Sequence, residues 1–248
     1  AAPTQFERMG GRVLNGLTGD TKLPIVTTAA TITAPAEGAA FAADANSTIG
    51  SATLSPQRYG AYVTVTEQLM LQGGPAVEQL ITQDMVTQLN RQIDKAVFDT
   101  IIGAGDGDNA TPVSAANMIA GEAALIAAGV DLSNVRVIAD AVAHSLLSDD
   151  AIVASVNAAI DRSTAGNFAA MGYPYFVTDL LPANLAGEGS LIMADFNMAA
   201  ALGLFGGIDI VVNPYSLDIN HQVRISVHKY ADAAVLHGAA AYTFHDNE

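Results

Sequence analysis

Residues 76–107 read AVEQLITQDMVTQLNRQIDKAVFDTIIGAGDG, and their pattern sets the architecture expected for the rest of the chain. No Gly or Pro occurs from Ala76 to Ile102, and apolar residues recur there at three- and four-residue spacing. This periodicity predicts one helix that begins at Pro75, where a missing backbone N–H is harmless, and stops at Gly103. At 1.5 Å per residue it is about 40 Å long. The apolar positions, which drift around the helix axis, are Val77, Leu80, Ile81, Met85, Leu89, Ile93, Ala96 and Val97.

Two β-rich phrases precede this helix within residues 25–72. IVTTAATIT (25–33) and RYGAYVTVTEQLM (58–70) carry the β-branched and alternating residues that are typical of strands. They predict a long two-stranded excursion, which is marginally stable alone and therefore needs something else to cover it. Residues 1–24 contain Gly at positions 10, 11, 16 and 19 and few large apolar side chains, which predicts an extended arm ordered by partners.

The chain after Gly103 changes to a mixture of helices and strands, which predicts a second compact unit and a strand-rich end. The expected helices are 114–128, 141–147, 151–161 and 196–202. The expected strands are 135–139, 175–178, 191–193, 208–212, 221–230 and 233–244, with a turn at Ala231-Asp232 between the last two.

Composition excludes several classes of protein. The chain has 248 residues and no Cys, so disulfides, thiolate nucleophiles and Cys-ligated metal sites are ruled out. Lys and Arg number 10 against 25 Asp and Glu, a formal charge of −15, and the basic residues are scattered from Arg8 to Lys229. This predicts no direct recognition of DNA or RNA, which needs clustered positive charge.

The sequence gives no reason to expect a targeting signal. The first residues have no apolar signal region, and the hydrophobic stretch 198–212 is interrupted by Asp209, so we expect neither a secretion signal nor a membrane span. The chain starts at Ala1 without Met, which suggests a processed or trimmed product.

No catalytic, cofactor or metal site is predicted. The loop GAGDGDN (103–109) follows a helix and lacks the lysine and hydroxyl of a phosphate loop. If Asp106 is taken as the first position of a calcium-binding loop, the twelfth position is Asn117 and not the Glu that such a loop requires. No GxSxG elbow occurs, and Asp149-Asp150 is explained by a helix start. The histidines, which match no metal-binding spacing, are His144, His221, His228, His237 and His245. We therefore expect a protein that is not an enzyme.

Four collinear passages carry a family resemblance. They are SATLSPQRYGAYVTVTEQLMLQ (51–72), the helical stretch 76–107, GYPYFVTDLLP with GSLIMADF (172–182 and 189–196), and VRISVHKYADAAVLHGAAAY (223–242). The motif positions within them are Ile93, Asp94, Gly103, Gly105, Gly172, Pro174, Asp179, Pro182, Asp195, Phe196, Arg224, Asp232, Ala241 and Tyr242. In order and content the passages resemble the major capsid proteins of tailed double-stranded DNA bacteriophages, the HK97-fold family, over about residues 23–244.

The resemblance implies an α+β fold with the HK97-like division of the chain. Residues 1–24 would form the N-terminal arm, 25–72 the extended hairpin (E-loop), 73–112 the peripheral P-domain with its spine helix, and 113–212 the axial A-domain. Residues 213–236 would be P-domain strands, and 237–248 a C-terminal strand that returns to the A-domain.

The resemblance also implies a function without a catalytic or cofactor site. Copies of the chain would form the hexamers and pentamers of an icosahedral shell that holds packaged DNA without sequence-specific binding. A decoration or cement protein, a portal and a maturation protease are further implied partners, and no membrane is involved. The location would be the virion, after assembly in the host cytoplasm.

Two departures and two alternatives accompany the resemblance. Many relatives carry an aromatic-x-x-Glu phrase where this chain has Phe41-Ala42-Ala43-Asp44, and residues 23–90 contain no Lys for the covalent cross-link of some relatives. One alternative is an encapsulin-type nanocompartment shell, which shares the fold and holds enzyme cargo. The other is an α/β enzyme with a lid hairpin, which a deep polar pocket would favour.

Overall fold

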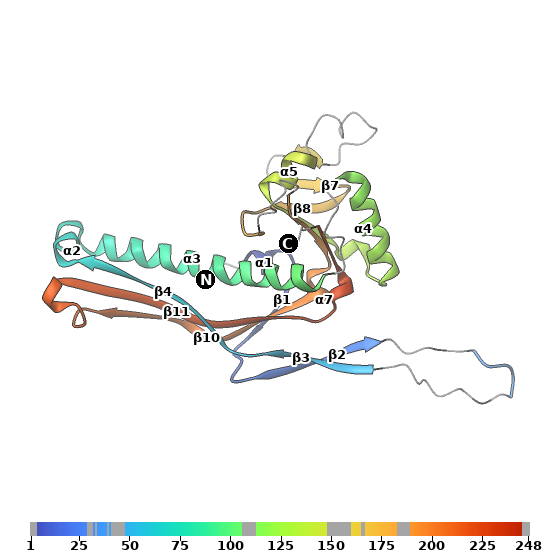
Figure 1. Cartoon of the computed structure of the whole chain (residues 1–248), viewed down its shortest axis with the longest axis horizontal. Helices are drawn as coiled ribbons and strands as arrows, with labels where there is room; N and C mark the ends of the chain where they lie inside the picture. The colour runs from blue at the N-terminus through green and yellow to red at the C-terminus, as the bar shows by residue number, and fades with distance from the viewer. Residues whose placement is uncertain are drawn as a thin grey trace.

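The computed structural model describes residues 4–28, 32, 34–38, 40, 48–105, 113–147, 160–164, 167–182 and 189–244. A long helix, α3 (Pro75–Ala104), runs along one face of a four-stranded sheet (Figure 1). The sheet has the order β1 (Arg12–Asn15), β10 (Ala200–Asn213), β11 (Gln222–Val235) and β4 (Gln57–Thr66). Val223, Ile225 and Val227 alternate along β11 and are buried, which forms a stripe for the apolar side of α3.

A second unit lies above the C-terminal end of α3 (Figure 1). Its six-stranded sheet has the order β12 (Ala241–Phe244), β9 (Leu191–Ala194), β5 (Arg136–Ala139), β8 (Tyr173–Val177), β7 (Asn167–Ala170) and β6 (Ile160–Thr164). Its helical segments are α4 (Ala115–Ala127), η1 (Leu132–Asn134), α5 (Ala141–Leu147), α7 (Phe196–Ala199) and η3 (Gly238–Ala240). Every residue of β9 is buried, so this strand reads as a continuous apolar run.

The remaining elements are a ribbon and two short helices. β2 (Thr21–Thr28) pairs with β3 (Thr48–Leu54) as an antiparallel ribbon that projects from the body (Figure 1). α1 (Gln5–Arg8) lies against α3, α2 (Glu67–Gly73) follows β4, and the turn before β11 contains η2 (Asp218–Asn220). Within the described part of the chain, no helix combines the length and the apolar character that crossing a membrane requires.

The main core joins α3, α4, α7 and both large sheets. Its largest fully buried side chains include Phe6, Phe98, Phe196 and Phe244. A smaller cluster of Leu54, Phe205 and Ala234 closes the base of the β2–β3 ribbon.

The structure confirms the α+β class and several predicted elements. The helix expected from Ala76 to Ile102 extends from Pro75 to Ala104, and α5 has the predicted bounds. The expected helix 114–128 is α4, which Ser114 caps by accepting a hydrogen bond from the N–H of Asn117 at 3.2 Å.

The expectation that residues 1–24 lack packed elements is wrong at residues 5–8 and at β1, although β1 and the start of β2 are extended. Residues 5–8 are helical, Phe6 is 0% exposed, and β1 pairs in parallel with β10. The Gly residues misled the prediction because two buried side chains, Phe6 and Met9, are enough to anchor the segment.

The expected pairing of the two β-rich phrases is also wrong. β2 pairs with residues 48–54, whereas residues 57–66 pair with β11 and residues 67–73 form α2. The N-terminal end of this helix is marked by Thr66, whose hydroxyl accepts a hydrogen bond from the N–H of Leu69. Cross-strand partners therefore decide what β-propensity cannot.

Three further boundaries differ from expectation. The expected helix 196–202 ends at Ala199, because Ala200 to Leu202 pair with β11. The turn expected at Ala231-Asp232 is instead the middle of β11, and the last strand begins at Ala241. The expected helix 151–161 lies mostly outside the described residues, and its last two positions belong to β6.

Candidate assembly surfaces

The β2–β3 ribbon exposes apolar side chains on both strands. Val26 and Ile49 are cross-strand partners, yet they are 57% and 77% exposed. Only the base of the ribbon is covered, where Leu23 and Ala52 pack on the cluster of Leu54, Phe205 and Ala234. A two-stranded ribbon is marginally stable in water, so its exposed part is a surface that a neighbour can cover.

A second apolar surface lies at the end of the four-stranded sheet that is distant from β1. Pairing between β1 and β10 ends at Leu204, and the register of β10 against β11 shifts between Phe205 and Asp209. Past this shift the large exposed apolar side chains include Ile210, Val211, Val212, Tyr215 and Ile219. α2 adds Leu69 and Leu71, so exposed apolar residues continue around this end of the sheet.

The face of the four-stranded sheet that points away from α3 carries an arginine and an aromatic ring. The Arg224 guanidinium lies 5.9 Å from the centre of the Tyr62 ring, and Tyr62 itself is largely exposed. Arginine and tyrosine are both enriched in protein interfaces, so this pair suits contact with another protein.

A buried polar centre lies under α1. Asp94, on the buried side of α3, accepts a hydrogen bond from the Gln5 N–H at 2.9 Å and another from the Phe6 N–H at 3.3 Å. Burial raises the pKa of the Asp94 carboxyl, although these hydrogen bonds oppose the shift. Burial also lowers the pKa of the Lys229 ammonium on β11, which the charge of Asp94 opposes. Both charges are therefore held where water is largely excluded.

An exposed ion pair links the two units near this centre. Arg91 of α3 donates to Asp179, in the loop after β8, at 2.5 Å. The hydrogen bond from Arg91 lowers the pKa of the Asp179 carboxyl. This pair therefore connects the middle of α3 to the unit with the six-stranded sheet.

The motif positions perform structural roles. Asp195 caps α7 by accepting from the N–H groups of Asn197 and Met198, and Asp232 accepts from the N–H of Ser55 at 2.8 Å. Gly172 adopts φ +89° in the turn before β8, a conformation that disfavours a side chain. Asp195 and Gly172 thus act on local structure, whereas Asp232 joins elements that are distant in the sequence.

The role of Asp94 was not predicted from the sequence. The available signal was a single carboxylate among the apolar positions Ile93, Val97 and Phe98 of an otherwise buried helix face. A buried carboxylate needs donors, but its donors lie in the N-terminal segment that was expected to be extended.

The four histidines in the described part of the chain lie in separate surroundings. The neighbours are Tyr175 for His144 (3.2 Å), Glu67 for His221 (3.4 Å) and Asp209 for His228 (3.4 Å), and His237 precedes η3. His245, Asp106, Asp108 and Asp149-Asp150 lie outside the described residues, as does Phe41-Ala42-Ala43-Asp44. Among the residues that the structure describes, no group of three or more His, Cys, Asp or Glu is placed to hold a metal ion.

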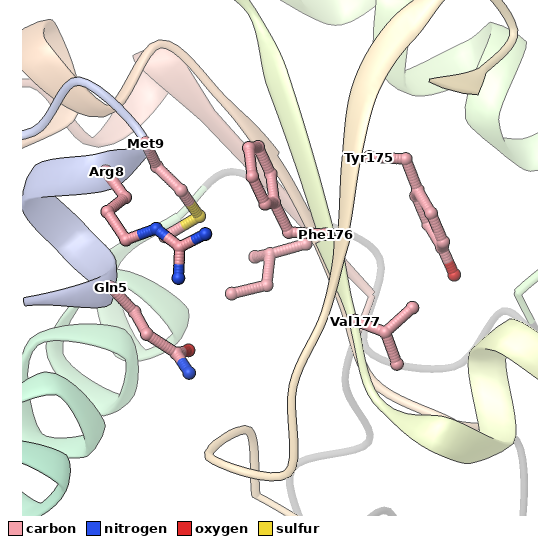
Figure 2. Close-up of a pocket in the computed structure, with 7 residues that line it drawn as sticks. Gln5, Arg8, Met9, Tyr175, Phe176 and Val177 are labelled. Atoms are coloured by element: carbon pink, nitrogen blue, oxygen red, sulfur yellow. The ribbon is translucent and has the colours of Figure 1, made fainter. Parts of the chain in front are cut away.

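One cavity of about 230 Å³ lies between α1 and the six-stranded sheet (Figure 2). Gln5, Arg8 and Met9 line one side, and Phe176 lies across from them. Ile138, Tyr175 and Val177 complete the lining. Arg8, Gln5 and Tyr175 contribute a guanidinium, an amide and a phenol, and the other lining residues are apolar. The lining is therefore mainly apolar.

Comparisons with protein families, curated sequences and solved structures place this chain among known proteins. The model of the phage capsid family matches residues 6–244. A search of curated protein sequences found no match. Among solved structures, a capsid described as that of a native GTA particle is 15% identical, with a TM-score of 0.74, covering 99% of this chain and 91% of that chain.

Two phage structures give similar values. Mycobacterium phage Che8 is 17% identical with a TM-score of 0.73, covering 99% of this chain and 92% of that chain. Gordonia phage Cozz is 15% identical with a TM-score of 0.71, covering 99% and 87%. The predicted HK97-like fold is confirmed, and neither the nanocompartment nor the enzyme alternative is favoured. Because the family model spans nearly the whole chain, this protein belongs to the phage capsid family and is a structural major capsid protein.

Proposed function

We propose that copies of this chain close into an icosahedral shell that encloses a double-stranded DNA genome. The observation that carries this proposal is the β2–β3 ribbon, which exposes Val26 and Ile49 although its base is firmly packed. A subunit that acts alone gains nothing from such a ribbon, whereas a shell subunit gains a surface for its neighbour. Hexamers and pentamers of the chain are the expected building units.

The proposed division of the chain follows the two sheets. The unit with the six-stranded sheet would be the axial A-domain, the four-stranded sheet with α3 the peripheral P-domain, and the ribbon the extended loop. β12 returns from the end of β11 to pair with β9, which agrees with a C-terminal strand in the A-domain.

The negative charge of the chain supports a shell that binds its packaged DNA only weakly. With a formal charge of −15, the subunit repels a phosphate backbone, so packaged DNA would contact the inner wall without sequence-specific binding. The proposed location is the virion, after assembly in the host cytoplasm. A decoration or cement protein, a portal and a maturation protease are the other proposed partners.

The experiment is negative-stain electron microscopy of the expressed chain, with a sizing column and a nuclease-protection assay. Closed polyhedral particles are expected, and particles from infected cells should protect DNA. Particles that contain a protein cargo and no nucleic acid would contradict the genome container. A single small species under all assembly conditions would contradict shell formation itself.

A further inference from the structure

The N-terminal segment 4–9 contacts three parts of the molecule. Its first helical amides donate to Asp94 on α3, as described above. The Gln5 side-chain oxygen accepts a hydrogen bond from the hydroxyl of Thr178, after β8, at 2.9 Å. Phe6 packs edge-to-face on Phe196 of α7, with ring centres 6.2 Å apart. The segment therefore bridges α3 and the unit with the six-stranded sheet.

A separate attachment between the same two bodies lies at the C-terminal end of α3. A Cβ atom on Gly238 would lie 2.5 Å from the carbonyl oxygen of Ala104, and one on Gly105 would lie 2.6 Å from Thr243 Cγ2. These backbone contacts leave no space for a side chain, so they form a close junction. Asp94 lies about 15 Å from Ala104 along the helix axis. The unit is thus held at the end of α3 and again at its middle.

The middle attachment is made by a short segment, residues 4–9, around the buried Phe6. A four-residue helix is not stable alone, so α1 depends on its docking contacts. Hollows flank it on two sides, namely the cavity of about 230 Å³ in Figure 2 and one of about 570 Å³. Thr4, Glu7, Asn15, Asn90 and Lys229 provide the polar lining of the larger one. Docking leaves Asp94 only 3% exposed and Lys229 only 9% exposed, which is unfavourable for both charges.

We propose that residues 4–9 are a releasable clip on Asp94. Docked, the clip holds the unit with the six-stranded sheet at one angle to α3. Released, it lets that unit pivot about the junction at Gly105 and Gly238. The ion pair of Arg91 and Asp179 lies at the same middle attachment but is exposed, so it does not replace the clip. Asp94 is the positioning residue in this mechanism. The proposal concerns one subunit and does not depend on shell formation.

The experiment measures, on the full chain, a distance that changes when the unit with the six-stranded sheet pivots relative to α3. Because the chain has no Cys, Thr87→Cys on α3 and Ser145→Cys on α5 place two spin labels at exposed positions without further changes. Labelled chains are diluted with unlabelled chains, so that only distances within one subunit contribute. Double electron–electron resonance then gives the distribution of distances between the two spin labels. Hydrogen exchange reports on the backbone amides of residues 5–9.

Asp94→Ala is expected to broaden or shift the distance distribution. It should also increase amide exchange at residues 5–9 about tenfold or more, since their hydrogen-bond acceptor is lost. Asp99→Ala is the matched control, because Asp99 lies on the same helix, is exposed and pairs with Lys95. The control should leave both readouts unchanged.

Phe6→Ala provides a second route to release without a change in α3. Amide protection in β5 and β9 reports whether the unit itself remains folded. Fast exchange at residues 5–9 with an unchanged distance distribution would overturn the proposal, because the segment would then not set the angle. Loss of protection throughout β5 and β9 in both variants would also overturn it, because the unit with the six-stranded sheet would then not stay folded when the segment is released.

Discussion

The N–H of Gln5 donates to Oδ2 of Asp94 at 2.9 Å, across 89 positions of sequence. This contact attaches the start of the described chain to the middle of α3. It gives a buried carboxylate two backbone donors and gives a short helix its N-terminal acceptor.

Removal of the Asp94 carboxylate should destabilise the protein. Asp94→Ala leaves two amides without an acceptor in a buried site, so we expect a loss of about 1–3 kcal/mol in the free energy of unfolding. Asp94→Asn keeps one acceptor oxygen and should lose less. Urea unfolding measures both, with Asp99→Ala as an exposed control. Equal losses for the alanine and asparagine variants would argue against the hydrogen bonds as the source of stability.

The contribution of Asp94 should depend on pH with a definite sign. Its folded-state pKa is raised above the usual 3.8, so the native state binds this proton more tightly than the unfolded state. The cost of burying the charge is complete at neutral pH. It is relieved as the pH falls through the folded-state pKa toward 3.8. Measured by urea unfolding, the native protein should therefore gain stability relative to Asp94→Asn on acidification, and a relative loss would reverse the assigned shift.

The ion pair of Arg91 and Asp179 should contribute little. Both side chains are substantially exposed, so a double-mutant cycle with Arg91→Ala and Asp179→Ala should give a coupling below about 1 kcal/mol. Because the pKa of Asp179 is lowered, this coupling is complete above pH 3.8 and is lost as the pH falls through the folded-state value. High salt should weaken it. A larger, salt-insensitive coupling would show that the pair is shielded from water.

A charge on the ribbon should block assembly without unfolding the subunit. Ile49→Lys replaces an exposed apolar residue, so the free energy of unfolding should change by less than about 0.5 kcal/mol. In a covered interface the same lysine is unpaired and unfavourable, so particles should disappear from electron micrographs. Ile119→Lys on α4 is the matched control, because Ile119 is also exposed but lies away from the ribbon. Normal particles from the ribbon variant would exclude this surface from assembly.

Mature particles should contain no covalent cross-link from residues 23–90, which include the extended hairpin except for Thr21 and Lys22 at the base of β2. Residues 23–90 have no Lys, so no lysine amine is present there to attack an asparagine of a neighbour. Boiled particles on a denaturing gel should give a single band for this chain. A ladder of covalent oligomers would refute the prediction and would direct attention to Lys22 or Lys95, the nearest lysines on either side.

The sequence by itself determined the elements whose signals are local. The spacing of Val77, Leu80, Ile81 and Met85 was enough to place α3, because helix periodicity is a property of neighbouring residues. Ser114 marked the start of α4 in the same way. The collinear passages also carried enough identity to give the family, which the match over residues 6–244 confirmed.

Only the tertiary structure decided how these elements pair. Residues 57–66 and 48–54 are both β-prone, yet one joins β11 and the other β2, since strand partners depend on contacts far along the chain. Ala200 to Leu202 suit a helix locally but become a strand because β11 supplies their hydrogen bonds. Asp94 follows the same principle. Its role requires the backbone N–H groups of Gln5 and Phe6, which lie far from Asp94 in the sequence. No local pattern contains that information.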